Sequence, residues 1–593
     1  MLERPTGTRR TGARASKDLD TSKKATLFID DLKNSLRKLV DSLWRLFRRH
    51  DQVRLNMAFA ISASRIVQSA STPLFILVCF GLFLTGILVY YALASRRPKN
   101  FPPGPPTLPI LGNLHIFPKT KAFLKFHEWG KKYGSLIGLK LGPQNVVILN
   151  DYRHVQELFD KRGAKYSDRP ANHIANDLIY QNKTHILFLP YGDDWRILRK
   201  TLQGLLNVVA VDNLLPIQNA EATQTMYQLL KEPEGWYDHI RRYSTAVILA
   251  SVFGLRGTSF DSPRVKALYH VQDQLTQIAE IGATPPVDVF PWLKSLPNFL
   301  SGWRKWALSI RAEHRAFYFG LMRDSKKQMQ KKGVKECFLA RMIKDQEKSG
   351  LSDEHIAYLG GTLMEAGSDT TASTLLSFLL AMVKYPEALK KCQEEVDALC
   401  GTNRSPTIHD FERLPYLRAT MNETLRWRPV AAGGIPHALT EDDYYEGYFL
   451  PKGTILFANT WAIHRTKEFN DAEAFMPERF LQNKFGIAST DAEANDESKR
   501  RVQYGFGAGR RVCSGQRLAE NSLIVNMAKL VWAFDIAPGP GTIGDSVDVN
   551  YTGGFLVAPK KFPLHLKPRS QPHIDIIEME YVGADEYLHQ FED

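Results

Sequence analysis

A long helical segment at residues 351–384, LSDEHIAYLGGTLMEAGSDTTASTLLSFLLAMVK, restricts the choice of fold. Ser352 is a suitable N-cap with acidic residues just after it, and Pro386 ends the helix. Just over thirty residues at 1.5 Å each give a helix about 48 Å long. Its second half is apolar on nearly every face. We therefore expect this helix to cross the core of a large domain.

The surrounding sequence predicts that domain at residues 110–570. Helical periodicity dominates it, with short strand-like pieces such as VVILN at 146–150. No alternation of strands and helices with a phosphate-binding loop appears, which disfavours a nucleotide-binding sheet. The sequence predicts one large domain, mainly α with small β-sheets.

An apolar run precedes the domain at residues 73–93, PLFILVCFGLFLTGILVYYAL. Its 21 residues carry no charge and span about 30 Å as a helix, the thickness of a bilayer core. We predict a transmembrane helix at 73–94, the alternative being a buried core helix. Three basic residues follow at 96–99 and favour a cytosolic location for the rest of the chain. A proline-rich hinge is expected at 95–109.

The two ends of the chain look like appendages. Residues 1–65 hold 15 Lys and Arg against 7 Asp and Glu, so they carry 8 of the 14 net positive charges. The remainder is only mildly basic, which argues against nucleic-acid binding. The basic extension at 1–72 is either a membrane-surface helix or, at 1–56, an artefact of the translation start, because Met57 opens an ordinary leader. The acidic tail at 571–593 is interpreted as a solvated extension.

The long helix carries an unusual motif, AGSDTT, at residues 366–371. A glycine costs about 1 kcal/mol in a helix interior, and threonine hydroxyls can bond the carbonyl one turn back and bend the helix. One interpretation is a kink with satisfied hydroxyls. The other is a local opening with a proton path through Asp369 and Thr370.

A second motif, FGAGRRVCSG at 506–515, contains one of only five cysteines, too few for a disulfide framework. Cys513 is a nucleophile, a buried structural thiol or a metal-bound thiolate. Its neighbours favour the third. Arg511 supplies a cation and Phe506 an apolar shield, and glycine amides stabilise a thiolate. Three glycines let the backbone adopt positive φ and approach a flat partner: Gly507, Gly509 and Gly515. A flat, anionic, iron-containing partner is haem.

The same stretch resembles the haem-binding loop F-x-x-G-x-R-x-C-x-G of the cytochrome P450 superfamily. The matching positions are Phe506, Gly509, Arg511, Cys513 and Gly515. AGSDTT is similar to the oxygen-activating motif of that family. Further family motifs occur in the same order as in the family: Trp195 and Arg199 in WRILR, Glu423 and Arg426 in ETLR, His437 in GGIPHAL and Arg479 in PERF.

The resemblance implies haem b (iron protoporphyrin IX) with Cys513 as axial ligand and a monooxygenase reaction in which Asp369 and Thr370 deliver protons. It implies that Phe506 and Gly509 shape the haem loop. It also implies haem carboxylate contacts from Arg511, Trp195, Arg199 and His437, and a structural network of Glu423, Arg426 and Arg479.

The resemblance also implies partners. No flavin or nicotinamide fingerprint occurs, so electrons are expected from an NADPH-dependent cytochrome P450 reductase. Microsomal members suggest a single-pass endoplasmic reticulum protein in contact with membrane lipid, with its catalytic domain in the cytosol. Fungal secondary-metabolism members suggest O2 and a lipophilic polyketide or terpenoid, hydroxylated or epoxidised. The alternatives are an O2-independent isomerase or dehydratase and a non-catalytic haem-binding membrane protein.

Overall fold

The computed structural model describes residues 72–280, 284–332, 337–492 and 494–592. Residues 1–71, with the expected membrane-surface helix, lie outside the described residues. The chain divides into two compact units, Met1–Val89 and Tyr90–Asp593.

The apolar run forms helix α3 (Thr72–Ala94). Several of its side chains are exposed, among them Leu77, Phe80 and Leu88. Among the residues that the structure describes, no helix is both long and apolar enough to cross a membrane. The transmembrane helix predicted at 73–94 is therefore not supported.

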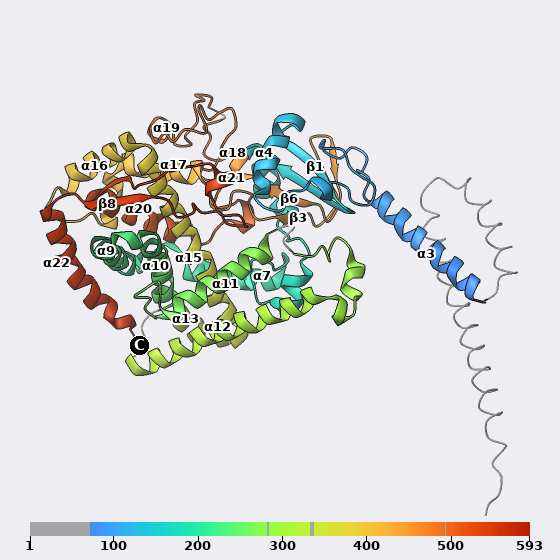
Figure 1. Cartoon of the computed structure of the whole chain (residues 1–593), viewed down its shortest axis with the longest axis horizontal. Coiled ribbons are helices and arrows are strands. Elements are labelled where there is room, and N and C mark those ends of the chain that lie inside the picture. Colours follow the sequence, from blue (N-terminus) through green and yellow to red (C-terminus); the bar gives the residue numbers. More distant parts are fainter. Residues whose placement is uncertain (1–71, 281–283, 333–336, 493, 593) are drawn as a thin grey trace, which may run out of the picture. The chain divides into compact units, whose positions relative to one another are not determined.

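The second unit is mainly helical, as predicted (Figure 1). Its α-helices are α4 (Ala122–Tyr133), α5 (Tyr152–Val155), α6 (Gly163–Tyr166), α7 (Asp193–Leu205), α8 (Val208–Asp212), α9 (Leu215–Lys231), α10 (Trp236–Ile248), α11 (Pro263–Ala279), α12 (Gly302–Lys332), α13 (Phe338–Lys344), α14 (Gln346–Ser349), α15 (Asp353–Lys384), α16 (Pro386–Cys400), α17 (Pro415–Trp427), α18 (Thr460–Ile463), α19 (Glu478–Gln482), α20 (Gln516–Ala533), α21 (Val547–Asn550) and α22 (Gln571–Leu588). Shorter 3-10 and π-helical turns are η1 (Leu114–Ile116), η2 (Gln156–Lys161), η3 (Ile174–Ile179), η4 (Pro233–Gly235), η5 (Leu249–Phe253), η6 (Pro291–Ser295), η7 (Asn298–Leu300), η8 (Ile408–Arg413), η9 (Gly509–Arg511) and η10 (His589–Phe591).

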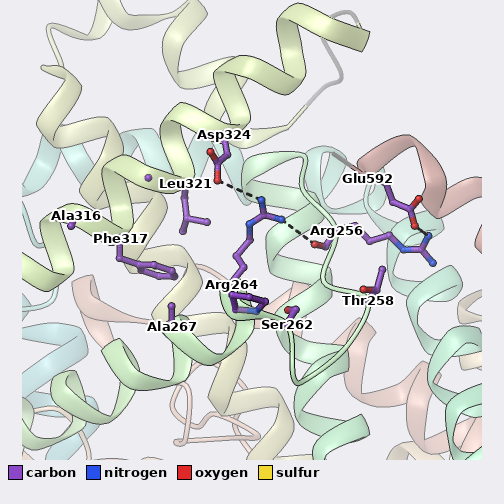
Figure 2. A pocket seen from close by; sticks show the side chains of 12 residues that line it. Arg256, Thr258, Ser262, Arg264, Ala267, Ala316, Phe317, Leu321, Asp324 and Glu592 are labelled. Atoms are coloured by element: carbon purple, nitrogen blue, oxygen red, sulfur yellow. Dashed lines mark hydrogen bonds and ion pairs between the residues drawn. The ribbon is translucent and has the colours of Figure 1, made fainter.

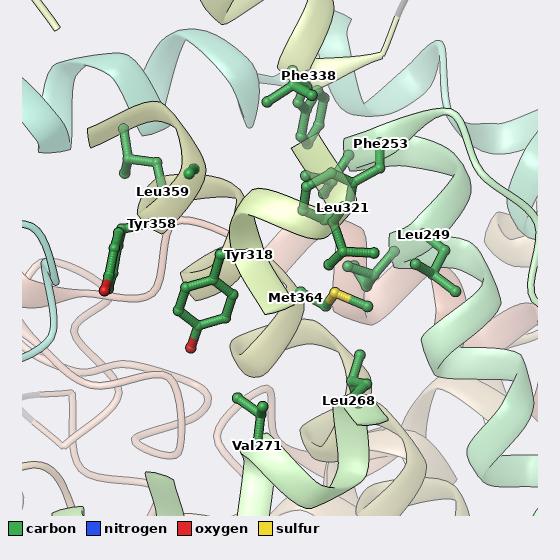
Figure 3. Packing of buried hydrophobic residues seen from close by; sticks show 14 of the residues in the cluster. Leu249, Phe253, Leu268, Val271, Tyr318, Leu321, Phe338, Tyr358, Leu359 and Met364 are labelled. Atoms are coloured by element: carbon green, nitrogen blue, oxygen red, sulfur yellow. The ribbon is translucent and has the colours of Figure 1, made fainter. Parts of the chain in front are cut away.

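Helix α15 is the long helix expected from the sequence. Ser352 caps it by accepting a hydrogen bond from the His355 amide, and the helix ends at Lys384 before Pro386. It packs against α10, α12 and α20, and its second half is almost entirely buried. Figure 3 shows the apolar cluster that Met364 of α15 shares with side chains from α11, α12 and α13. The prediction that this helix crosses the core is confirmed.

The β-structure consists of three small sheets. The largest has the order β1-β2-β6-β3, formed by β1 (Leu136–Leu141), β2 (Gln144–Leu149), β6 (Ile455–Ala458) and β3 (His437–Ala438). β2 pairs in parallel with β6, which lies about 300 residues later, whereas the other pairings are antiparallel. Two hairpin-like pairs complete the set: β4 (Asp443–Tyr445) with β5 (Tyr448–Leu450), and β7 (Phe534–Pro538) with β8 (Leu564–Pro568).

The C-terminal segment corrects the interpretation of 571–593 as a solvated extension. Residues 571–588 form α22, which packs against α9. Its carboxylates pair with buried cations: Glu580 lies 3.4 Å from Lys529 Nζ, and Asp585 lies 2.6 Å from Arg256 Nη2. The acidic residues therefore neutralise cations of the core. Three buried apolar residues of the helix also pack into the core: Ile576, Ile577 and Leu588.

Candidate functional site

The cysteine loop lies between Phe506 and the start of α20. The Cys513 amide donates to the Phe506 carbonyl at 2.8 Å, which closes the loop. Two of the three glycines have positive φ, as predicted: Gly507 at 75° and Gly509 at 60°. The third prediction is wrong, because Gly515 has φ −94° as the N-cap of α20. A Cβ on Gly509 would lie 2.0 Å from the Phe159 carbonyl oxygen, so only glycine permits this approach.

The Cys513 thiol lies in an enclosed but accessible position. Its side chain is exposed. Burial among protein atoms nevertheless raises its pKa, and this effect outweighs a hydrogen bond from the Gly515 amide and the charge of Arg199, which lower the pKa. Protein atoms thus surround the thiol without covering it, which leaves the sulfur open to a ligand. This is the position required of a ligand to a buried group.

Two arginines beside the loop bond to backbone carbonyls. Arg199 donates to the Val512 carbonyl at 2.6 Å, and its Nε is buried without a partner. Arg511 donates to backbone carbonyls, including those of Ser167 and Leu189. Burial lowers the pKa of Arg199, and that of Arg511 to about 10. Neither forms an ion pair with a carboxylate of the described chain. The charge of Asp168 raises the pKa of Arg511 without pairing with it. An anionic ligand would pair with these two arginines, and haem carries two carboxylates.

Trp195 and His437, the other two residues expected to contact the haem carboxylates, lie close by. The Arg511 guanidinium stacks 4.5 Å over the Trp195 ring. His437 stacks on Phe159 at 3.9 Å and donates from Nδ1 to the Tyr166 carbonyl at 2.7 Å. Burial, followed by nearby arginine charge, holds the pKa of His437 well below its ordinary value. The structure thus gathers Trp195, Arg199, His437 and Arg511 around the cysteine loop.

Sequence reasoning missed Arg169. This buried side chain donates to the Pro436 carbonyl at 2.6 Å and contributes to the low pKa of His437. Burial also lowers the pKa of Arg169 well below its ordinary value. In the sequence, Arg169 is marked only by the proline that follows it, and this pair of residues is too common to identify a site residue.

The AGSDTT motif is part of an unbroken helix. The Thr370 hydroxyl donates to the Ala366 carbonyl at 2.7 Å, and the predicted local opening is absent. Gly367 has a packing reason, because a Cβ there would lie 2.4 Å from Ile248 Cδ1. Burial raises the pKa of Asp369, with Arg241 opposing it. Ala366 is exposed although it lies mid-helix. α15 also packs against α20, the helix that follows Cys513.

The predicted structural network is present. Arg426 binds both oxygens of Glu423, at 2.6 and 2.7 Å, and Arg479 Nε lies 3.2 Å from the same carboxylate. The Met476 amide also donates to it at 2.8 Å. Glu423 and Arg426 are fully buried. Such a network holds α17 against the segment that leads to α19.

A large cavity occurs elsewhere in the second unit. Figure 2 shows it between α11, α12 and the C-terminal residues, with a volume of about 700 Å³. Arg264 and Asp324 form an ion pair across it. None of the predicted site residues lines this cavity.

The comparisons with known proteins agree with this geometry. Residues 102–566 match the family described as "Cytochrome P450". "Cytochrome P450 monooxygenase yanC" of Aspergillus niger is 37% identical over 84% of this chain and 95% of its own. "Cytochrome P450 monooxygenase patH" of Penicillium expansum is 38% identical over 86% and 97%.

A solved structure shares the fold. It is described as a zebra fish cytochrome P450 with progesterone and superposes with a TM-score of 0.62 at 25% identity, over 75% of this chain and 99% of that chain. The match over most of the sequence and the exposed thiol in its glycine loop lead to one conclusion. The chain belongs to the cytochrome P450 family of haem-dependent monooxygenases.

Proposed function

We propose that this enzyme uses haem b, held by Cys513, to oxidise a lipophilic small molecule with O2. The observation that carries the proposal is the accessible Cys513 thiol beside Arg199 and Arg511, which form no ion pair among the described residues. Bound haem supplies the iron at which dioxygen is reduced. The protein supplies the thiolate, the binding of the carboxylates and the protons.

The residues around the loop have separate tasks. The Gly515 amide and the N-terminus of α20 favour negative charge on the Cys513 sulfur. Arg199 and Arg511, with Trp195 and His437, bind the haem carboxylates and fix the orientation of the ring. Phe506 and Gly509 keep the loop closed against water and close to its neighbours.

Proton delivery is assigned to Asp369 and Thr370. The Thr370 hydroxyl lies on the same face of α15 as the exposed Ala366, one turn away. Its proton can leave the Ala366 carbonyl and turn toward the exposed side of the helix at Ala366. The raised pKa of Asp369 makes this carboxyl a better proton donor near neutral pH.

The proposal also names a substrate class and partners. We propose as substrate a fungal secondary metabolite, a polyketide or terpenoid, that is hydroxylated or epoxidised; the relatives named above are cytochrome P450 monooxygenases of fungi, which supports a fungal substrate. The neighbour with bound progesterone supports a lipophilic ligand. Electrons come from an NADPH-dependent cytochrome P450 reductase. The exposed apolar side chains of α3 attach the enzyme to lipid of the endoplasmic reticulum, with the catalytic domain in the cytosol.

Spectroscopy tests the thiolate assignment. The reduced, CO-bound wild-type protein is expected to show the red-shifted band of a thiolate-ligated haem. Cys513→Ser should lose both the band and turnover. Cys400→Ser, which changes a buried thiol outside the loop, should keep both. A histidine-type spectrum in the wild type, or full turnover in Cys513→Ser, would refute the proposal. Turnover that persists without O2 would point to an isomerase.

A second experiment tests attachment to membranes. The full chain should sediment with microsomes, and a chain without residues 1–94 should remain in the supernatant. Equal sedimentation of the two chains would contradict the role given to α3.

A further inference from the structure

The cavity between α11, α12 and the C-terminal residues has no role in the function proposed above. Its volume of about 700 Å³ lies in the range of small-molecule sites, about 300–1,000 Å³. The cavity is open to solvent, because Ala316, one of its lining residues, is exposed. A molecule of moderate size can therefore reach its walls.

One wall of the cavity is apolar. α12 contributes Phe317 and Leu321 to this wall, and α11 contributes Ala267 (Figure 2). Phe317 is only partly buried where it packs against the apolar cluster of the core, so part of its ring remains available for contact. This wall suits the apolar part of a ligand.

Gly320 leaves room beside the apolar wall. It lies in the interior of α12, where a glycine weakens the helix relative to alanine. Among the described residues, a Cβ at Gly320 would meet only a guanidinium nitrogen of Arg323, at an ordinary 3.8 Å. At Gly361 and Gly367, by contrast, a Cβ would lie 2.6 and 2.4 Å from other side chains. Packing explains those two glycines, whereas a ligand in the cavity would explain Gly320.

Arg264 brings a cation into the cavity. Its guanidinium extends between α11 and α12 (Figure 2), with Nη2 3.4 Å from an Asp324 carboxylate oxygen and Nη1 3.4 Å from the Arg256 carbonyl oxygen. Both distances exceed the roughly 2.7–2.9 Å of a strong charge-assisted hydrogen bond. The side chain is 22% exposed, so a ligand can reach it. A carboxylate matches the planar guanidinium with two parallel hydrogen bonds.

The surroundings favour an anion over a cation. Ser262 and Arg264 belong to the N-cap and first turn of α11, and this end of a helix favours negative charge. Two other charged residues of the lining, Arg256 and Glu592, pair with each other. Asp324 is 43% exposed and can turn into solvent when a ligand carboxylate takes its place at Arg264.

We propose that this cavity binds a lipophilic carboxylic acid, with the carboxylate at Arg264 and the apolar part against Phe317 and Gly320. None of the residues assigned to haem lines the cavity, so this site is separate from the oxidation proposed above. α11 and α12 both pack against α15. A bound acid therefore joins two neighbours of the helix that carries Asp369 and Thr370.

A pair of probe ligands tests the proposal on the full-length, haem-bound protein. The probes are 4-benzoylbenzoate and its neutral match, 4-benzoylbenzamide, measured by equilibrium dialysis. The wild type is expected to bind the acid about tenfold more tightly than the amide, the effect of charge-assisted hydrogen bonds to one guanidinium. On irradiation the benzophenone group bonds to a nearby C–H, and peptide mass spectrometry should find the acid on residues 262–267 or 316–324.

Three substitutions test the charge of the site. Arg264→Gln should remove the preference for the acid and keep the affinity for the amide. Asp324→Asn should bind the acid about two- to fivefold more tightly than the wild type, because a competing carboxylate is removed. Arg323→Gln, which changes an exposed arginine of α12 outside the cavity lining, should keep both affinities.

A fourth substitution tests the room at Gly320. Gly320→Leu puts a good helix former at this position and fills the space beside the apolar wall. This variant should keep the haem absorption spectrum of the wild type, and it should lose the affinity for both probes and the crosslinks at 262–267 and 316–324.

Several results would overturn the proposal. They are equal affinities of the wild type for acid and amide, crosslinks found only elsewhere in the chain, and weaker binding of the acid by Asp324→Asn. Tighter binding of the cationic analogue 4-benzoylbenzylamine would assign the cavity to a cation instead. A loss of preference in Arg323→Gln as large as that in Arg264→Gln would show a general effect of surface charge rather than a site.

Discussion

The acidic C-terminal helix gives the most informative stability experiment. Glu578 and Glu580 both lie on α22 and both pair with a lysine. Glu580 faces Lys529, whose side chain is 1% exposed, at 3.4 Å. Glu578 faces Lys231, and both of these side chains are nearly half exposed. Glu580→Gln and Glu578→Gln therefore make the same chemical change at a buried cation and at a solvated one.

The expected magnitudes differ clearly. Removing one partner of a buried pair costs about 3–5 kcal/mol. Glu580 is itself 25% exposed, and Ser405 still accepts a hydrogen bond from Lys529, so we expect a loss of about 2–3 kcal/mol for Glu580→Gln. For Glu578→Gln we expect less than about 1 kcal/mol. Urea denaturation of the full-length protein, followed by circular dichroism, measures both losses.

The pH dependence provides an independent check. Burial lowers the pKa of Lys529, and the Glu580 carboxylate partly opposes this. Without the carboxylate, the folded-state pKa of Lys529 falls further in Glu580→Gln. Below this lower pKa the ammonium is charged in both proteins and the loss of stability is complete, whereas above the folded-state pKa of the wild type the amine is neutral in both and the loss disappears. The difference from the wild type should therefore shrink as the pH rises and be absent at the ordinary lysine pKa of about 10.4. Equal losses in the two variants, or a difference that grows with pH, would refute the reasoning.

Three further outcomes are expected. Gly367→Ala should lose about 1–3 kcal/mol of stability by urea denaturation, because its methyl group would lie 2.4 Å from a side-chain carbon of α10; Gly583→Ala on α22, with open space around it, should be neutral or stabilising. Arg199→Ala should lower the ratio of bound haem to protein after dialysis, whereas Arg196→Ala, an exposed arginine on the same helix, should not. Glu423→Gln should cost about 3–5 kcal/mol and yield mostly haem-free protein by absorption spectroscopy; a fully loaded, stable variant would contradict the structural role of this carboxylate.

The sequence predicted those features whose causes are local. The cap at Ser352, the stop before Pro386 and the apolar second half defined α15 almost to the residue. Short sequence motifs also predicted the glycine required at Gly509. The i, i+3 spacing of Glu423 and Arg426 likewise predicted that the two side chains share one face of a helix.

The features that sequence reasoning missed depend on contacts between distant segments. Seven acids in the C-terminal tail look solvated until Lys529, 51 residues before Glu580, is found facing one of them. His185 Nε2 lies 2.8 Å from a Glu365 carboxylate oxygen, although the two residues are 180 positions apart and neither lies in an informative sequence pattern. The local opening expected at AGSDTT failed for a related reason. The glycine at 367 was interpreted as a sign of function, but the structure explains it by the tight packing of α10 against this position.

The parallel pairing of β2 with β6 has a consequence for synthesis of the chain. At roughly 5–20 residues per second, a ribosome needs roughly 15–60 s to reach β6 after finishing β2. During this interval the β1–β2 hairpin has one edge with unpaired backbone groups, the kind of edge that joins other chains. The N-terminal third of the molecule thus leaves the ribosome before its sheet can be completed. We expect slower aggregation, and a higher yield of folded protein, when chaperones cover that edge during translation.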